Sequence, residues 1–164
     1  MRASGILLPI FSLPNSYGIG TLGKEAYDFV DFLEKCHQTY WQVLPIGPTS
    51  YGDSPYQSFS VFAGNPYFID FDLLKEEGLL EESDYAEYLD ESLSIDYGKI
   101  YNTRYLVLIR AYTKFDIKLL KNFEKENSDW LEDFSLFMTL KDYHHGVSFL
   151  EWKDEYKFRN KKAL

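Results

Sequence analysis

The sequence is poor in cysteine and has fewer cations than anions. Its one cysteine, Cys36, excludes an internal disulfide framework, and the Cys and His positions show no zinc-ligand spacing. Lys and Arg total 17 against 26 Asp and Glu, so the net charge is −9. A nucleic acid or an anionic membrane surface would on average repel such a chain. We therefore expect no nucleic acid, membrane, metal or cofactor among its ligands.

The sequence also lacks a long apolar run. The stretch near the N-terminus is interrupted by Pro9, Ser12 and Pro14, which makes it too short for the hydrophobic region of a signal peptide. No segment approaches the ~18 consecutive apolar residues of a membrane span. We therefore expect a cytoplasmic protein.

Two local patterns fall short of a ligand site. The glycine-rich segment 17–23 follows an apolar run but lacks the Lys-Ser/Thr pair of a P-loop, which argues against nucleotide binding. His144 and His145 have no third metal ligand nearby in the sequence, and the simplest interpretation is the end of a helix.

Aromatic residues, in contrast, are abundant at 18% of the chain, and they gather in residues 50–70, SYGDSPYQSFSVFAGNPYFID. Tyr and Phe rings stack on the apolar face of a sugar, while Asp, Asn, Gln and Ser bind its hydroxyls. The stretch thus favours an uncharged, polyhydroxylated ligand. Two alternatives remain open: Phe59, Phe62 and Phe68 could be core residues, and residues 53–56 could form a solvated turn.

The order of elements predicts the start of a parallel α/β fold. Residues 5–11 are typical of a buried strand, 24–36 of a helix with one apolar face, and 39–46 of a second strand. A strand–helix–strand unit implies parallel pairing and places residues 50–70 at the carboxyl end of the sheet, where ligands bind. Two strands cannot make a finished parallel sheet.

The remainder is predicted to be helical. The acidic region 72–94 indicates short helices, 99–125 one long amphipathic helix, and Ser128 the N-cap of another. Asp70 and Asp72 are interpreted as solvated or capping residues rather than a catalytic pair.

Three stretches closely resemble one enzyme family. They are RASGILLPIFSLPNSYGIGTLG, YWQVLPIGPTSYGDSPYQSFSVFAGNPYFID and NSDWLEDFSLFMTLKD. Together they are similar to the amino-terminal part of the 4-α-glucanotransferases, the amylomaltase or disproportionating-enzyme family, and the resemblance covers essentially the whole chain. Near the end the chain departs from the family, with Phe149 and EWK where Trp and Trp-Pro are usual.

The resemblance implies an α/β fold that is the opening part of a (β/α)8 TIM barrel with a helical insertion subdomain, apparently truncated. Residues 1–70 would supply the first two barrel strands, the first helix and a glucan-binding loop. Residues 71–164 would form a mostly helical insertion subdomain, incomplete at its C-terminus.

The family transfers a segment of an α-1,4-glucan to a new 4-position in an acceptor by retaining, two-carboxylate chemistry. None of the 26 acidic residues matches the motifs of the catalytic carboxylates, so the resemblance implies no catalytic residue here. The isolated chain is expected to be inactive, with maltooligosaccharides and the missing C-terminal part of the same enzyme as partners.

The resemblance also assigns substrate-binding residues. It implies that Tyr56 stacks on a sugar ring beside the scissile bond, with Ser54 as its neighbour. The remaining assignments are loop-shaping or hydroxyl-bonding residues and two tyrosines of an accessory glucan-binding patch: Asp53, Gln57 and Asn65, then Tyr51 and Tyr97.

Other functions remain open at this point. One is a non-catalytic maltooligosaccharide-binding protein that kept the loop without the chemistry. Another is a helical interaction module in which residues 99–143 pair with a partner. Within the enzymes, a related hydrolase of the α-amylase clan is the nearest alternative.

Overall fold

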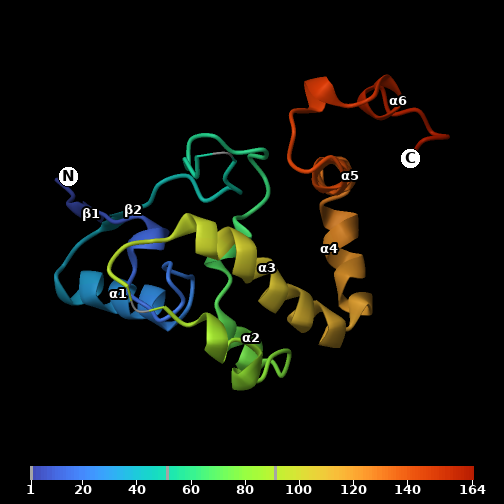
Figure 1. Ribbon diagram of the computed structural model, residues 1–164. Coiled ribbons are helices and arrows are strands. Elements are labelled where there is room, and N and C mark those ends of the chain that lie inside the picture. The colour runs from blue at the N-terminus through green and yellow to red at the C-terminus, as the bar shows by residue number, and fades with distance from the viewer. Residues whose placement is uncertain (1, 51, 91) are drawn as a thin grey trace. The chain divides into compact units, whose positions relative to one another are not determined.

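The computed structural model describes residues 2–50, 52–90 and 92–164 (Figure 1). These residues form two compact units, Met1–Phe115 and Asp116–Leu164. The first unit contains both described strands, and the second is helical throughout its regular structure.

The two strands confirm the predicted parallel pairing. Strand β1 (Gly5–Leu7) pairs with β2 (Tyr40–Gln42), and Gly5 lies opposite Tyr40. Helix α1 (Lys24–Lys35) connects them, as the apolar periodicity predicted. Both strands are shorter than the predicted segments. In the first segment the chain leaves β1, and Pro9 leads into the 3₁₀ helix Ile10–Ser12.

The expectation of a buried first strand is wrong. Leu7 is 54% exposed and Tyr40 on the neighbouring strand is 63% exposed. Burial begins only beyond β1, at Ile10. The reason is that no second layer of described residues covers the two-stranded sheet on both faces, which parallel sheets ordinarily require.

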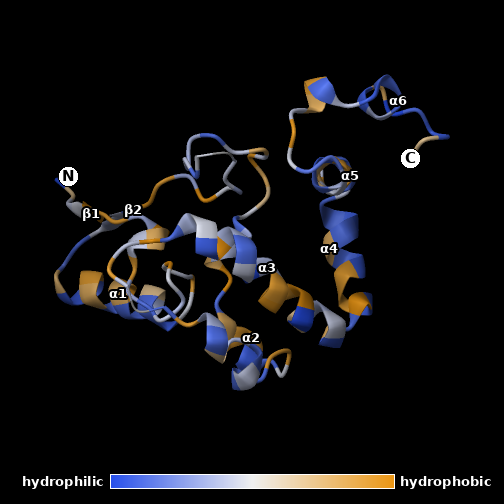
Figure 2. Cartoon of the chain, viewed as in Figure 1, coloured by the Kyte–Doolittle hydropathy of each residue, from blue (hydrophilic) through white to orange (hydrophobic). Residues whose placement is uncertain are grey.

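A first hydrophobic core lies between α1 and the last residues of the aromatic stretch 50–70. Ala26 and Leu33 of α1 are buried, whereas Val30 on the predicted apolar face is half exposed. Figure 2 shows the resulting mixture of apolar and polar residues along α1. The core cluster consists of Ile10, Leu13, Ile19, Ala26, Tyr67, Phe68 and Ile100.

A second core joins the acidic region to the long helix. Its elements are α2 (Phe71–Glu76), the 3₁₀ helices Glu82–Asp84 and Ala86–Tyr88, and α3 (Tyr97–Lys114). The buried members of this cluster are Tyr17, Phe71, Leu80, Tyr85, Val107 and Ala111. The predicted short helices are thus present.

The second unit begins with a break that the sequence did not predict. The expected single helix 99–125 is wrong, because Phe115 is extended and the Asp116 side chain accepts a hydrogen bond from the Lys118 N–H. The chain restarts as the 3₁₀ helix Ile117–Leu119 and α4 (Leu120–Glu126).

The next helix begins later than predicted. Helix α5 spans Leu131–Tyr143, and Trp130 precedes it. Ser128 is not its N-cap, because the Ser128 hydroxyl donates to the Lys125 carbonyl instead. The 3₁₀ helix Phe149–Glu151 and α6 (Asp154–Lys157) complete the unit.

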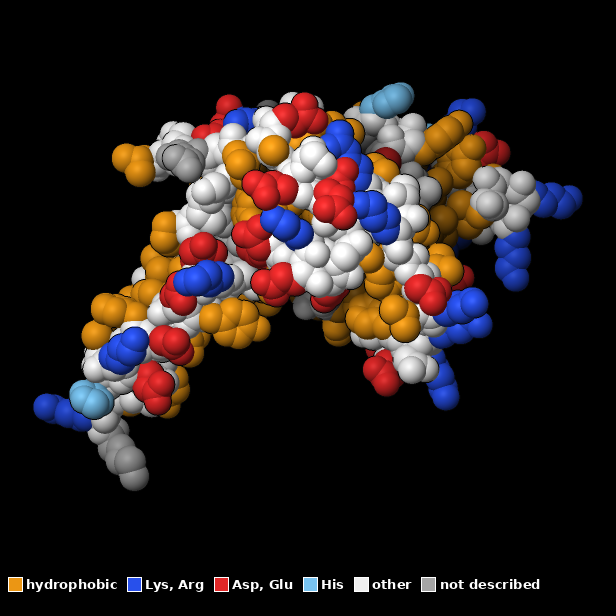
Figure 3. All heavy atoms as spheres, turned by 90° about the horizontal axis from the view of Figure 1, so that it is seen from below, with side chains coloured by type: hydrophobic (Ala, Val, Ile, Leu, Met, Phe, Trp, Pro, Cys, Tyr) orange, Lys and Arg blue, Asp and Glu red, His pale blue; other side chains and the backbone are white. Residues whose placement is uncertain are grey.

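The surface carries both signs of charge with apolar side chains between them (Figure 3). No helix in the described ranges is long and apolar enough to cross a membrane. Several large apolar side chains of α1 and the strands are exposed, Tyr27 and Phe32 among them.

Candidate functional site

The site is built on a loop that closes on itself. We call residues 46–65 the aromatic loop. The Asn65 N–H donates to the Ile46 carbonyl at 2.8 Å, so the loop returns to the point at which it leaves. An antiparallel bridge between Thr49 and Ser58 ties its two sides together. Compact loops with close ends, packed by their own side chains, are frequently functional.

Serine hydroxyls hold the far side of the aromatic loop. The Ser58 hydroxyl donates to the Ser60 carbonyl at 2.7 Å, and the Ser60 hydroxyl accepts from the Phe62 and Ala63 N–H groups at 3.1 Å each. A Cβ on Gly47 would lie 2.5 Å from the Ser58 hydroxyl, so the two sides approach this closely only because residue 47 is glycine.

Tyr56 is presented outward. Its side chain is 73% exposed. The Ser54 hydroxyl accepts a hydrogen bond from the Tyr56 N–H at 3.4 Å, and the Gln57 N–H donates to the Ser54 carbonyl at 3.0 Å. Ser54 is half-buried and Gln57 is exposed. The turn therefore exposes the ring of Tyr56 to solvent, with the polar residues Ser54 and Gln57 beside it, on a backbone held by hydrogen bonds.

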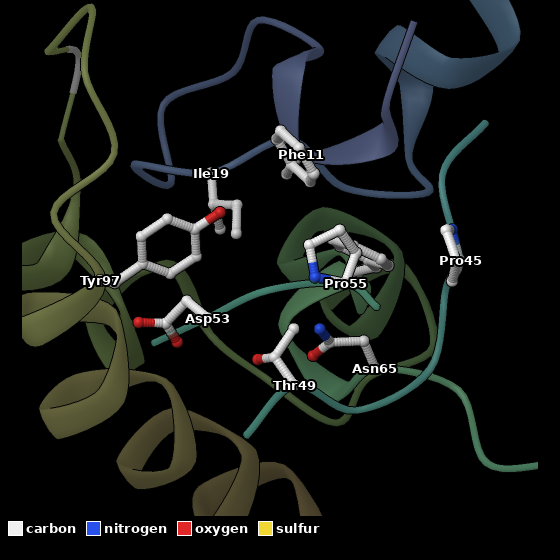
Figure 4. Close-up of a pocket in the computed structure, with 9 residues that line it drawn as sticks. Phe11, Ile19, Pro45, Thr49, Asp53, Pro55, Asn65 and Tyr97 are labelled. Atoms are coloured by element: carbon white, nitrogen blue, oxygen red, sulfur yellow. The ribbon is translucent and has the colours of Figure 1, made fainter. Parts of the chain in front are cut away.

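Three other predicted residues meet in one pocket beside the loop. Asp53 and Asn65 come from the aromatic loop, and Tyr97 comes from the first turn of α3 (Figure 4). The remaining lining residues are Phe11, Ile19, Pro45, Thr49, Pro55 and Phe68. The pocket thus combines an apolar wall with a carboxylate, an amide and a phenol.

Burial changes the acidity of groups in and near this pocket. Desolvation raises the pKa of the Asp53 carboxyl above its usual value. Desolvation also raises the pKa of the Tyr97 phenol, and the charge of Asp53 adds to that effect. Desolvation also raises the pKa of Tyr67 to about 12, and the nearby charges of Tyr105 and then Asp53 add to the rise.

Asn65 is buried, and its side chain shapes the loop. Its Oδ1 accepts a hydrogen bond from the Tyr67 N–H at 2.9 Å, which caps the 3₁₀ helix Pro66–Phe68. The three phenylalanines differ in burial: Phe68 is a core residue, Phe59 is half-buried, and Phe62 is largely exposed. Tyr51, predicted for the accessory patch, lies outside the described residues.

The glycine-rich segment does not form an anion site. Gly18, Gly20 and Gly23 have the G-x-G-x-x-G spacing and α1 starts directly after them. However, a Cβ on Gly23 would lie 2.0 Å from Asp70 Oδ2, so a carboxylate already occupies the space beside this turn. The glycines serve close packing.

Asp70 has the expected capping role. Its Oδ1 accepts from the Leu73 N–H at 3.1 Å and caps α2, while its Oδ2 accepts from the Thr21 hydroxyl at 2.6 Å. Asp72 accepts a hydrogen bond from the Tyr85 hydroxyl. Across the described ranges, no three His, Cys, Asp or Glu side chains lie close enough to hold a metal ion.

Comparisons with known proteins point to one family. The sequence model of the family described as 4-alpha-glucanotransferase matches residues 8–164. The 4-alpha-glucanotransferase of Clostridium butyricum is 51% identical over 94% of this chain and 33% of its own length. That of Streptococcus pneumoniae serotype 4 is 50% identical over 93% of this chain and 32% of its own length.

A solved structure agrees. Amylomaltase from Streptococcus agalactiae in complex with acarbose is similar with a TM-score of 0.91 and 42% identity, over 99% of this chain and 34% of that one. The chain spans about a third of the length of the relatives it matches.

Proposed function

Because the chain belongs to the 4-alpha-glucanotransferase family, we propose that it supplies the glucan-binding wall of a transferase. The whole protein would move a segment of an α-1,4-glucan to a new 4-position in glucose or another α-1,4-glucan. The similarity to an amylomaltase in complex with acarbose supports an oligosaccharide ligand. The proposed setting is the cytoplasm.

The fold proposed for the whole protein is a (β/α)8 barrel. Residues 1–70 would contribute its first two strands, first helix and the aromatic loop, and 71–164 a helical insertion. The parallel pairing of β1 with β2 around α1 supports this architecture, since a barrel is built from such units.

The proposed role of the aromatic loop is to bind and orient sugar rings. The Tyr56 ring would lie against the apolar face of one glucose unit, with Ser54 and Gln57 beside the hydroxyls. Asp53, Asn65 and Tyr97 would form or support a second contact, together with Tyr51. An aromatic wall that excludes water favours transfer to a sugar hydroxyl over hydrolysis.

The chemistry would come from carboxylates on the part of the family's sequence that this chain does not span. In retaining transfer one carboxylate forms a glycosyl–enzyme and a second acts as acid and then base. The proposed partner of this chain is that remaining part. The 164-residue chain is expected to bind without turning over.

The observation that carries the proposal is the exposed Tyr56 ring on a backbone fixed at both ends. Titration of maltoheptaose into the chain should show saturable binding. Substituting Tyr56→Ala should weaken it roughly five- to tenfold, the loss of one aromatic stacking contact. Tyr27→Ala on α1 is the matched control, because Tyr27 is 68% exposed and lies outside the loop.

No saturable binding by the unmodified chain, or equal loss in the two variants, would overturn the proposed site. A second assay separates binding from catalysis. The chain should release no glucose from maltotriose; release with transfer products would place the catalytic residues within it, and release without them would favour a hydrolase of the α-amylase clan.

A further inference from the structure

A buried cation contacts the segment that follows the aromatic loop. Arg104 of α3 is only 2% exposed. Its Nη2 donates to the Ile69 carbonyl, and its Cζ lies 4.0 Å from the centre of the Phe71 ring. The Cζ also lies 5.9 Å from the centre of the Tyr17 ring. The guanidinium therefore contacts the chain four residues after the end of the loop.

Burying this charge is unfavourable, and few groups compensate it. Desolvation lowers the pKa of Arg104 to about 10, which nearby Asp70 and Tyr17 only partly oppose. Neither Nε nor Nη1 has a hydrogen-bond partner within residues 2–50, 52–90 and 92–164. An apolar side chain would fill such a position at lower cost, unless the cation has a specific task.

The contacts around Arg104 indicate what that task is. Three consecutive residues after the loop are each held by a different group. The Phe68 carbonyl accepts from the Leu22 N–H at 2.9 Å, the Ile69 carbonyl from Arg104, and the Asp70 carboxylate from the Thr21 hydroxyl. These bonds form an anchor, residues 68–70, that lies three residues beyond the closing bond of Asn65.

We propose that Arg104 is a positioning residue for glucan binding: it fixes Ile69 at the anchor and so holds the aromatic loop in its binding geometry. Phe68 lines the same pocket as Asp53 and Asn65, so a shift of the anchor moves part of the pocket lining. The consequence for sugar binding rests on the proposed function, whereas the effect on loop order does not.

The test compares two arginines of the same helix. Arg110 also lies on α3, donates through Nη1 to the Asp84 carbonyl and lies 5.7 Å from the Tyr88 ring centre, but it does not contact the anchor. Hydrogen exchange by mass spectrometry is measured on the unmodified chain and on Arg104→Met, Arg104→Lys and Arg110→Met, with maltoheptaose titrations alongside.

For Arg104→Met we expect roughly tenfold faster exchange confined to residues 46–70 and roughly tenfold weaker binding, since a hydrogen bond to a charged group is lost. Arg104→Lys, which keeps the charge, should lie between, and Arg110→Met should leave the loop unchanged. Faster exchange spread evenly over residues 2–115, or none, would overturn the positioning role.

Two safeguards keep the result decisive. If Arg104→Met fails to fold, Thr21→Val is used instead, because it removes one hydroxyl that binds the same anchor. Hydrogen exchange in this variant must become faster in the aromatic loop and not elsewhere, or the proposal fails. If the unmodified chain binds no maltoheptaose, the proposed function fails, and the exchange pattern alone decides the role of Arg104 in ordering the loop.

Discussion

Asp53 combines two features that are uncommon in one residue. Its φ of 54° lies in the left-handed region, which Asp tolerates better than most residues, and its carboxyl is partly withdrawn from solvent in the pocket beside Tyr97. Such backbone conformations persist only where the surroundings impose them. The loop bonds described above supply that constraint.

The charge of Asp53 should be detectable in its neighbours. Replacing Asp53 by Asn keeps a side chain that tolerates the left-handed backbone but removes the anion. Because that anion opposes formation of tyrosinate nearby, the pKa of Tyr97 should fall toward its ordinary value in Asp53→Asn. Tyrosine Cζ chemical shifts followed through an alkaline titration would measure the change.

Asp72→Asn is the control for that experiment. Burial raises the pKa of Tyr17 and Tyr85 in the second core, and the Asp72 carboxylate raises both pKa values further. This variant should therefore lower the pKa values of those two phenols and leave Tyr97 as it was. An unchanged Tyr97 titration in Asp53→Asn would show that the carboxylate does not face the phenol in solution.

Among the elements, α2 ends in a way that depends on one glycine. Gly78 follows the helix with a φ of 75°, and the Gly78 and Leu79 N–H groups donate to the Lys75 and Leu74 carbonyls. This hydrogen-bonded helix end requires a left-handed residue after the C-cap. No atom lies within 4 Å of a Cβ built on Gly78, so space is not the constraint.

Gly78→Ala should consequently lower the free energy of unfolding by about 1 kcal/mol, the cost of a left-handed alanine. Gly64→Ala is its counterpart, since Gly64 also has open space for a Cβ but does not have a positive φ. That variant should be neutral or slightly stabilising. Urea unfolding followed by circular dichroism compares the two, and equal midpoints would contradict the assigned helix end.

Local patterns predicted the elements that local forces determine. The apolar period of α1 and the β-branched and aromatic residues near 39–42 identified the strand–helix–strand unit, and the chain order implied its parallel pairing. The break after Lys114 escaped prediction because the apolar period continues through 117–120, while the capping bond of Asp116 interrupts the helix. The lengths of the two strands were not predicted correctly, because strand length depends on pairing with neighbouring strands.

The sequence could single out the residues of the candidate site, but it could not predict how they are arranged in space. Tyr56 and Ser54 are only two residues apart in the chain, so their turn follows from local order. The meeting of Asp53 with Tyr97 depends on how α3 packs against the loop, which no spacing reveals. Arg104 gave no signal, because one arginine within an amphipathic helix is ordinarily a solvated residue.

At the scale of the molecule, the exposed apolar surface around the two strands should promote self-association of the chain. Leu7 and Tyr40 lie on adjacent parallel strands whose outer edges are unpaired among the described residues, and such edges favour association. The purified chain should therefore self-associate as its concentration rises.

Tyr40→Lys should reduce that association, since a charge at an exposed strand opposes edge pairing. Leu93→Lys is the comparison, because Leu93 is also a solvent-exposed apolar residue but lies in the segment between the 3₁₀ helix Ala86–Tyr88 and α3. Sedimentation velocity over a range of concentrations gives the answer. Similar sedimentation for both variants and the parent chain would show that the chains do not associate through the strands.

The bond from Asn65 to Ile46 has an evolutionary and practical consequence. The two ends of the loop meet at one hydrogen bond. Its interior can therefore be lengthened, shortened or replaced while β2 before it and α2 after it keep their positions. Under the proposed function, the sugar-contacting residues other than Tyr97 are then encoded in one contiguous stretch of gene, which recombination or a designer can exchange in a single step.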